Sequence, residues 1–295
     1  MRLPLLSPST PHEIALYGLH GFAASRFSGS WIALKIINEV ADSTQTIATD
    51  ELEQPFVIPE QGPKADVHFR WPTAQLEQEA IQLDYRLPAV LDYFRANTLD
   101  RIMYKDAASK IGLIAAGKSW PDLLEALRLL GLDEARLHER GIALYKPAMI
   151  WPLEPQMLGK FADGLEEIIV IEEKTGLIED QIKKLLYGLA KPPLVIGKRR
   201  LDGTVLFQAT GDLNPEMISV GLGRHLGSDV PDMGRRLERV ERAISAHVEF
   251  AVPPAVRKPF FCSGCPHNRS TVVPEGSRAT AGIGCHGLAA WMRSD

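Results

Sequence analysis

The sequence predicts an α/β fold with a parallel sheet between about residues 105 and 200. One observation is the unbroken apolar run from Ile168 to Ile171, which is typical of an interior strand covered on both faces. A second is the alternation of strand-like and helix-like segments, which indicates right-handed crossover connections. A third is a helix with defined ends, because Ser119 precedes it as a cap, Pro121 lies in its first turn and Gly131 follows it.

Within this region the apolar runs at 111–116, 142–145, 168–171 and 194–196 predict four strands. Helical spacing of apolar residues predicts helices after Ser119, around 155–163 and at 178–189. Each predicted helix follows a predicted strand, so the four strands are expected to lie parallel in one sheet.

The flanking regions are less regular. We expect two helical pieces within residues 1–50, near 13–20 and 30–37, divided by Gly18, Gly21 and Gly29. A proline-rich loop is expected at 51–72, followed by a helix at 74–96 that is interrupted near Pro88. A short helix should begin at Asn214-Pro215, and a charged helix is expected at 232–250.

Composition excludes several classes of protein. The chain has 295 residues, of which 45% are hydrophobic and 24% charged, as in ordinary globular domains. Its formal net charge of -4 gives no reason to expect a nucleic-acid partner. No segment has the apolar length needed to cross a bilayer, and prolines break the N-terminal apolar run, so a cytoplasmic location is expected.

All 3 cysteines lie in the last 34 residues: Cys262 and Cys265 as C-x-x-C, and Cys285 after Gly282-Ile283-Gly284. An odd number of cysteines in a long chain does not indicate a disulfide framework. Thiolates on glycine-rich turns are typical of iron–sulfur sites, although such a site needs a fourth ligand. Zinc is equally compatible with the spacing, because His267 or His286 would complete a set of three cysteines and one histidine. A redox C-x-x-C is a third interpretation.

The segment from Gly112 to Ser119 matches the phosphate-loop pattern G-x-x-x-x-G-K-[ST], and Glu172-Glu173 follow a strand as a magnesium-organising acid would. A phosphate loop needs flexible backbone between its two glycines. Here those positions hold apolar residues that belong to the predicted strand. A strand–turn–helix corner is therefore the preferred interpretation, with a phosphate-loop NTPase as an alternative.

Three motifs in the C-terminal region resemble indolepyruvate ferredoxin oxidoreductase and, more broadly, the 2-oxoacid:ferredoxin oxidoreductases. They are Phe-Cys-Ser-Gly-Cys-Pro-His-Asn at 261–268, Val-Pro-Glu-Gly-Ser-Arg-Ala at 273–279 and Gly-Ile-Gly-Cys-His at 282–286. The resemblance implies a [4Fe–4S] cluster held by Cys262, Cys265 and Cys285, beside the diphosphate of thiamine diphosphate. It implies contacts of that cofactor with Gly264, His267, Asn268, Gly282, Ile283 and Gly284. His267 is the implied catalytic residue near the reacting oxoacid.

The resemblance also implies an organisation into partial domains. Residues 1–50 would be the C-terminal remnant of a pyrimidine-binding domain and 51–104 a connecting region. Residues 105–227 would form a domain similar to the C-terminal domain of transketolase, followed by a helical linker at 228–258. Residues 259–295 would begin the diphosphate-binding domain, so that partial thiamine-diphosphate-binding domains flank the parallel-sheet domain.

The family reaction implied by the resemblance is oxidative decarboxylation of an aryl 2-oxoacid to its acyl-CoA, with electrons passed to ferredoxin. It uses thiamine diphosphate with Mg²⁺, coenzyme A and iron–sulfur clusters. Neither the activating carboxylate of the pyrimidine half-site nor a Gly-Asp-Gly diphosphate loop is visible in the sequence. The chain therefore resembles the middle of a longer polypeptide. We expect it to be inactive alone, to need the missing domains or subunits as partners, and to form a homo-oligomer when complete.

Overall fold

The computed structural model describes residues 2–53, 55–64, 66–69, 71–72, 74–227, 232–250, 258–280 and 282–292. The chain divides into two compact units, Met1–Ala243 and Ile244–Asp295. The larger unit contains the sheet, and the smaller one contains the cysteine motif. The domain limits expected at 50, 104, 227 and 258 stay a prediction, and the expected linker 228–258 lies partly outside the described residues.

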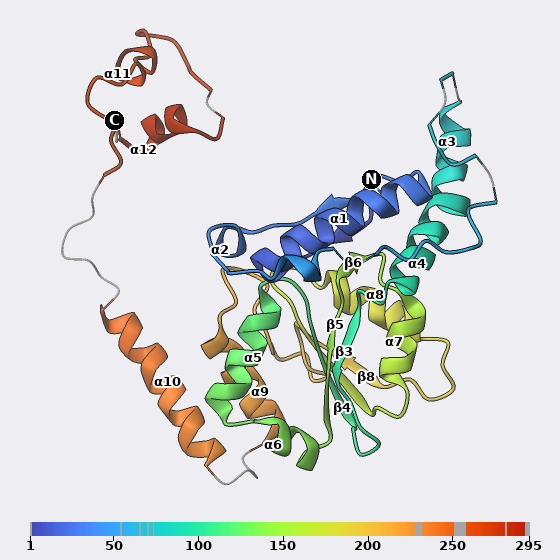
Figure 1. The fold of residues 1–295 in the computed structure, drawn as a ribbon. Helices are drawn as coiled ribbons and strands as arrows, with labels where there is room; N and C mark the ends of the chain where they lie inside the picture. Colours follow the sequence, from blue (N-terminus) through green and yellow to red (C-terminus); the bar gives the residue numbers. More distant parts are fainter. Residues whose placement is uncertain are drawn as a thin grey trace. The chain divides into compact units, whose positions relative to one another are not determined.

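A five-stranded sheet in the order β3-β5-β4-β7-β8 forms the centre of the larger unit (Figure 1). The predicted strands are confirmed as β4 (Ile111–Ala115), β5 (Ile142–Lys146), β7 (Glu167–Ile171) and β8 (Leu194–Ile196), and they pair in parallel. Unlike these four, β3 (Arg101–Tyr104) is antiparallel to β5 and was not expected from the sequence. The predicted parallel α/β sheet is confirmed.

Helices cover both faces of this sheet. On one face α5 (Ser119–Leu130) and α9 (Pro215–Leu226) pack over alternate residues of β4, β5 and β7. On the other face lie α7 (Pro155–Ala162) and α8 (Leu177–Leu186). The short α6 (Glu134–Glu139) leads into β5, and α10 (Met233–Phe250) follows α9. Because both faces are covered, every residue from Ile168 to Ile171 is at most 1% exposed.

The N-terminal region differs from the expectation. A single helix, α1 (Pro11–Ser28), runs through Gly18 and Gly21 and ends at Gly29, whose φ of 71° suits glycine. The second helical piece expected near 30–37 is wrong. That segment is extended and contains β2 (Ala33–Leu34), which pairs with β1 (Leu5–Leu6), while the short α2 (Asn38–Ala41) follows it.

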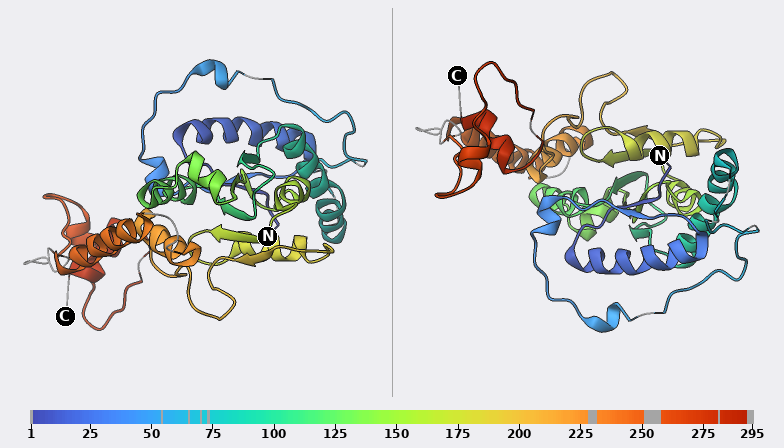
Figure 2. Two further views of the ribbon diagram at one scale, coloured as in Figure 1. Left: turned by 90° about the horizontal axis from the view of Figure 1, so that it is seen from below. Right: turned by 90° about the horizontal axis from the view of Figure 1, so that it is seen from above.

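The strand β6 (Met149–Trp151) joins this N-terminal region to the sheet domain, because β1 pairs with β6 on the edge opposite β2. A buried ion pair adds a second connection. Lys146, at the end of β5, contacts Glu13 on α1 and donates to Ser9 Oγ at 2.7 Å. Burial opposes the charge on Glu13, but the ammonium of Lys146 keeps the pKa of that carboxyl below its usual value. In both views of Figure 2, α1 (blue) lies beside the green part of the larger unit.

Between these regions, residues 49–96 form mostly loop and helix. A short 3-10 turn, η1 (Thr49–Glu51), ends where the expected loop begins. The expected helix is α3 (Gln75–Ile81) and α4 (Leu87–Ala96), joined by the π-helical turn η2 (Gln82–Arg86). Pro88 lies in the first turn of α4. Because proline has no backbone N–H to donate to the preceding turn, the regular α-helical hydrogen bonding is interrupted there, at η2. None of the described helices is both long and apolar enough to cross a membrane.

The smaller unit begins within α10, and three short elements follow among its described residues. They are α11 (His267–Ser270), the 3-10 turn η3 (Cys285–Leu288) and α12 (Ala289–Met292). The two cysteine-bearing segments are turns that precede or form these elements, as the glycines in the sequence indicated.

Candidate functional site

The C-x-x-C segment folds as a tight turn. The backbone N–H of Cys265 donates to the carbonyl of Cys262 at 3.0 Å, and Gly264 between them has a φ of 77°. Asn268 closes the turn from outside, because its Nδ2 donates to the same carbonyl at 3.3 Å. The thiol of Cys262 is exposed and that of Cys265 is half-buried. Both thiols of this turn are therefore accessible to a metal centre.

His267 lies beside this turn. Its Nδ1 is 3.3 Å from the Sγ of Cys265, and its ring centre is 5.4 Å from that of Phe261. The ring centre of His286 lies 6.3 Å from that of His267, and the two rings are inclined by 23°. His267 thus lies near both the first cysteine turn and the residue that follows Cys285.

The second turn carries Cys285, whose side chain is exposed. Gly282 donates its N–H to Nε2 of His286 at 3.1 Å, and Gly284 has a φ of 147°. Ile283 between them is fully exposed. The glycines therefore shape this turn, and an exposed apolar side chain at its tip has no covering group among the described residues.

Three thiols and two histidines are ligands that iron–sulfur clusters and zinc both accept. Among the described residues, however, no three His, Cys, Asp or Glu side chains are grouped closely enough to hold a metal ion. The thiols and imidazoles described in this segment are chemically suited to a metal centre, but their positions are too far apart to hold one. The assignments of Cys262, Cys265 and Cys285 as ligands, and of His267 as catalytic, stay predictions.

A second cluster of polar residues lies in the larger unit, where β4 and β7 end. The phosphate-loop pattern falls here, and the strand β4 takes up the residues between its two glycines, as predicted. Gly112 is required by packing, because a Cβ there would lie 2.8 Å from the ring of Phe161. Gly117 has a φ of 56°, and a Cβ on it would lie 2.4 Å from Ser7 Oγ. Both glycines thus have structural reasons unrelated to a nucleotide.

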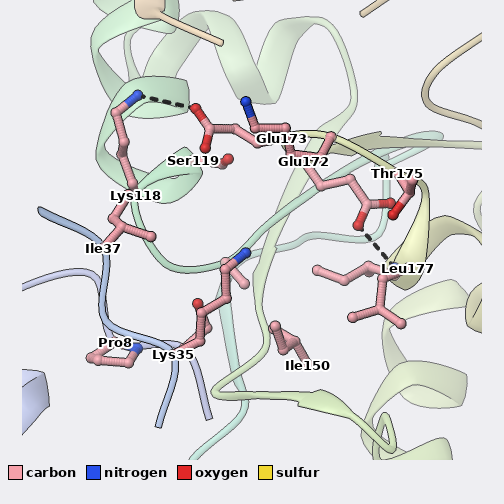
Figure 3. Close-up of a pocket in the computed structure, with 14 residues that line it drawn as sticks. Pro8, Lys35, Ile37, Lys118, Ser119, Ile150, Glu172, Glu173, Thr175 and Leu177 are labelled. Atoms are coloured by element: carbon pink, nitrogen blue, oxygen red, sulfur yellow. Dashed lines mark hydrogen bonds and ion pairs between the residues drawn. The ribbon is translucent and has the colours of Figure 1, made fainter. Parts of the chain in front are cut away.

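Lys118 and Glu173 face each other at this point. Lys118 Nζ donates to Asp122 Oδ2 at 2.7 Å and to the carbonyl of Leu213 at 2.9 Å, and it lies 3.5 Å from a carboxylate oxygen of Glu173 (Figure 3). These partners raise the pKa of Lys118 above its usual value although burial opposes them. The lysine therefore binds the protein's own acceptors.

Glu172 lies next to this pair and caps a helix. Its carboxylate accepts from the backbone N–H groups of Ile178 at 2.9 Å and Glu179 at 3.0 Å, at the start of α8. Burial raises the pKa of Glu172, and these two hydrogen bonds offset part of that effect. The sequence placed a lysine and two glutamates after strands, and the structure brings Lys118, Glu172 and Glu173 together at one hollow. The flexible loop that a nucleotide site needs is replaced by the strand β4.

Together the two units define a doubly covered parallel α/β domain followed by a segment of cysteine-bearing turns. The sequence profile of the indolepyruvate oxidoreductase domain matches residues 101–249, which is half of the chain. The chain belongs to this family.

Curated relatives extend the match. The chain is 25% identical over 272 residues to the indolepyruvate oxidoreductase subunit IorA of Methanothermobacter marburgensis, covering 90% of this chain and 38% of that protein. It is 25% identical over 276 residues to IorA of Thermococcus kodakarensis, covering 91% of this chain and 39% of that protein. The chain thus spans about two fifths of the length of these relatives.

Two solved structures share part of the fold. The 2-oxoglutarate:ferredoxin oxidoreductase from Magnetococcus marinus aligns with a TM-score of 0.46 and 12% identity, over 76% of this chain and 42% of that chain. A split-gene transketolase aligns with a TM-score of 0.39 and 10% identity, over 76% of this chain and 57% of that chain.

Proposed function

We propose that this chain is part of a cytoplasmic oxidoreductase that oxidatively decarboxylates aryl 2-oxoacids such as indolepyruvate. The 2-oxoacid and coenzyme A would give acyl-CoA, carbon dioxide, a proton and two electrons, and ferredoxin would accept the electrons one at a time. The observation that supports this proposal is the family match over residues 101–249, immediately followed by the cysteine motif at 261–286. The complete enzyme would include the domains or subunits that the longer relatives contain, and would be a homo-oligomer.

Thiamine diphosphate with Mg²⁺ would supply the carbanion chemistry when bound. This chain would contribute the turns at Gly264 and Gly282–Gly284, where small residues let backbone N–H groups approach an anionic group. Ile283 and Asn268 are the proposed neighbours of that cofactor. His267 is the proposed group near the oxoacid, and its proximity to Cys265 and to His286 supports this.

We further propose that Cys262, Cys265 and Cys285 bind a [4Fe–4S] cluster in the complete enzyme, with a fourth ligand still to be identified. Zinc is the second candidate, and one contact favours it. The 3.3 Å between Cys265 Sγ and His267 Nδ1 is close to the roughly 3.5 Å expected of two ligands on one tetrahedral zinc ion. Because a cluster would use the thiolates and zinc would also use a histidine, variants can distinguish them.

The test is metal content after anaerobic reconstitution, with iron, sulfide and zinc measured together with the visible absorption. Cys285→Ser should lower iron content at least severalfold, whereas His286→Ala should leave it unchanged. His138→Ala, a histidine of the larger unit, serves as the matched control. Stoichiometric zinc that is lost in His267→Ala or His286→Ala would contradict the cluster and support a zinc-stabilised module.

A further inference from the structure

A hollow of about 140 Å³ lies at the carboxyl ends of β4 and β7 (Figure 3). In the sheet order the chain leaves β4 toward β5 and leaves the neighbouring β7 toward β8, so these two connections run in opposite directions at this point. In open α/β sheets, ligands bind in the crevice outside the strand ends where the order reverses. Small-molecule pockets usually enclose roughly 300–1,000 Å³, so this hollow suits an ion rather than a nucleotide.

Two serines whose residues are largely buried line the hollow, and their hydroxyls have no protein partner. Ser119 is 6% exposed and Ser7 is 7% exposed, and neither hydroxyl makes a hydrogen bond to the described part of the chain. The sequence suggested that Ser119 caps α5, but the helix begins at Ser119 itself and no side chain caps it. Neither hydroxyl oxygen is among the buried unpaired polar atoms of the described residues, so both hydroxyls are open to the hollow and can donate to a ligand there.

The start of α5 also faces this hollow. This helix has 12 residues and no side-chain cap. The N–H of Trp120 donates to the carbonyl of Gly117 at 3.0 Å, the N–H of Asp122 donates to the carbonyl of Lys118 at 3.3 Å, and Pro121 has no N–H, so the N–H of Ser119 is the group left for a ligand in the first turn. This N–H and the positive end of the helix dipole favour an anion. The two observations are independent, because the hydroxyls of Ser7 and Ser119 do not belong to the backbone of the helix.

The charged side chains at the hollow agree with an anion. Three lysines and two glutamates line it. The glutamate oxygens already accept from Lys118 and from backbone N–H groups. Lys174 donates to the carbonyl of Gly211 at 2.6 Å. Lys35, by contrast, makes no ion pair with the described residues and is exposed at the rim. An ammonium and two hydroxyls therefore remain available to a ligand.

We propose that this hollow binds a small oxyanion, a phosphate or carboxylate group, through Ser7, Ser119, Lys35 and the first turn of α5. The oxygens of the anion would accept from the two hydroxyls and from the N–H of Ser119, while Lys35 would balance its charge. The site belongs entirely to the larger unit and is separate from the cysteine turns, so its occupancy does not depend on the function proposed above.

Titration calorimetry of the full chain with inorganic phosphate at constant ionic strength tests this site, with acetate as the carboxylate arm and chloride as the non-oxyanion control. Phosphate or acetate should bind saturably where chloride does not. Lys35→Gln and Ser119→Ala should each weaken binding about tenfold, the effect of one lost charge-assisted or buried hydrogen bond.

Lys191→Gln is the matched control, because Lys191 is exposed and does not line the hollow. This variant should bind phosphate as tightly as the unaltered chain, and thermal melting should show that Ser119→Ala is folded. Lys35 is on the surface, so its variant keeps the test valid even if Ser119→Ala is unstable. Absence of saturable binding, or equal weakening in all three variants, would overturn the proposal.

Discussion

Asp100 is a buried carboxylate, 4% exposed, whose role is structural. One of its oxygens accepts the hydroxyl of Tyr145 at 2.8 Å, and the other accepts the N–H of Ala148 at 2.8 Å. Burial raises the pKa of Asp100 to about 6, although these hydrogen bonds act in the opposite direction. The group therefore fixes the chain between β5 and β6 and makes the stability of this region depend on pH.

The sign of that dependence follows from the raised pKa. An unfolded aspartate titrates near pH 4, so between about pH 4 and pH 7 the folded state holds more protons and stability falls as pH rises. Asp100→Asn keeps an acceptor for Ala148 but cannot ionise. Relative to this variant, the unaltered chain should lose about 2–3 kcal/mol of unfolding free energy over that range. Urea unfolding at both pH values measures this difference. A constant difference would show that Asp100 has an ordinary pKa.

At the scale of elements, β7 is the interior strand on which the domain depends. It lies between β4 and β8, and Val170 in its middle is 1% exposed. Val170→Asp would bury an unpaired charge and should destabilise the domain by several kcal/mol, enough to unfold it. Val205→Asp, at a position 54% exposed, is the matched control and should be nearly neutral. Thermal melting by circular dichroism compares the two, and a Val170→Asp variant that melts with the unaltered chain would contradict the interior placement.

The sequence predicted those elements whose signal is local. Runs such as Ile168 to Ile171 and the end of α5 at Gly131 depend on neighbouring residues, and both agree with the structure. The extended segment around Ala33 was mistaken for helix because its partner, β1, lies nearly thirty residues earlier, and pairing over that separation leaves no periodic pattern. Gly21 was taken as a break, although α1 continues through it and a Cβ there would make an ordinary contact with Ile32 at 3.6 Å.

For the candidate sites too, local features could be predicted from the sequence and features built from distant residues could not. The turn at Cys262 and Cys265 could be predicted because its geometry follows from two residues of spacing, and Gly264 adopts the positive φ that the turn needs. The hollow near Ser119 could not be, since Ser7 and Lys35 reach it from a distant part of the chain. Its only local sign was the motif around Lys118, whose composition imitates a nucleotide site.

At the scale of the whole molecule, the chain provides a sheet domain and a second unit with the cysteine turns. It covers 38% and 39% of the length of two of its relatives. A cofactor bridging two half-sites gains most of its affinity from contacts on both sides. We therefore expect that this chain alone supplies only a part of the proposed reaction.

This expectation gives a prediction for activity. The chain alone should not reduce ferredoxin or a dye with indolepyruvate and coenzyme A, and should not bind thiamine diphosphate tightly in the presence of Mg²⁺. Adding the remaining domains, separately or in one polypeptide, should give turnover that His267→Ala reduces on the order of 10²–10⁴-fold if this imidazole transfers a proton. His138→Ala is the control and should retain full turnover, because His138 pairs with Asp106 in the larger unit. The measurement is electron-acceptor reduction under anaerobic conditions, with acyl-CoA and carbon dioxide quantified as products. Turnover by the chain without a partner would refute the view that it forms only part of the catalytic unit.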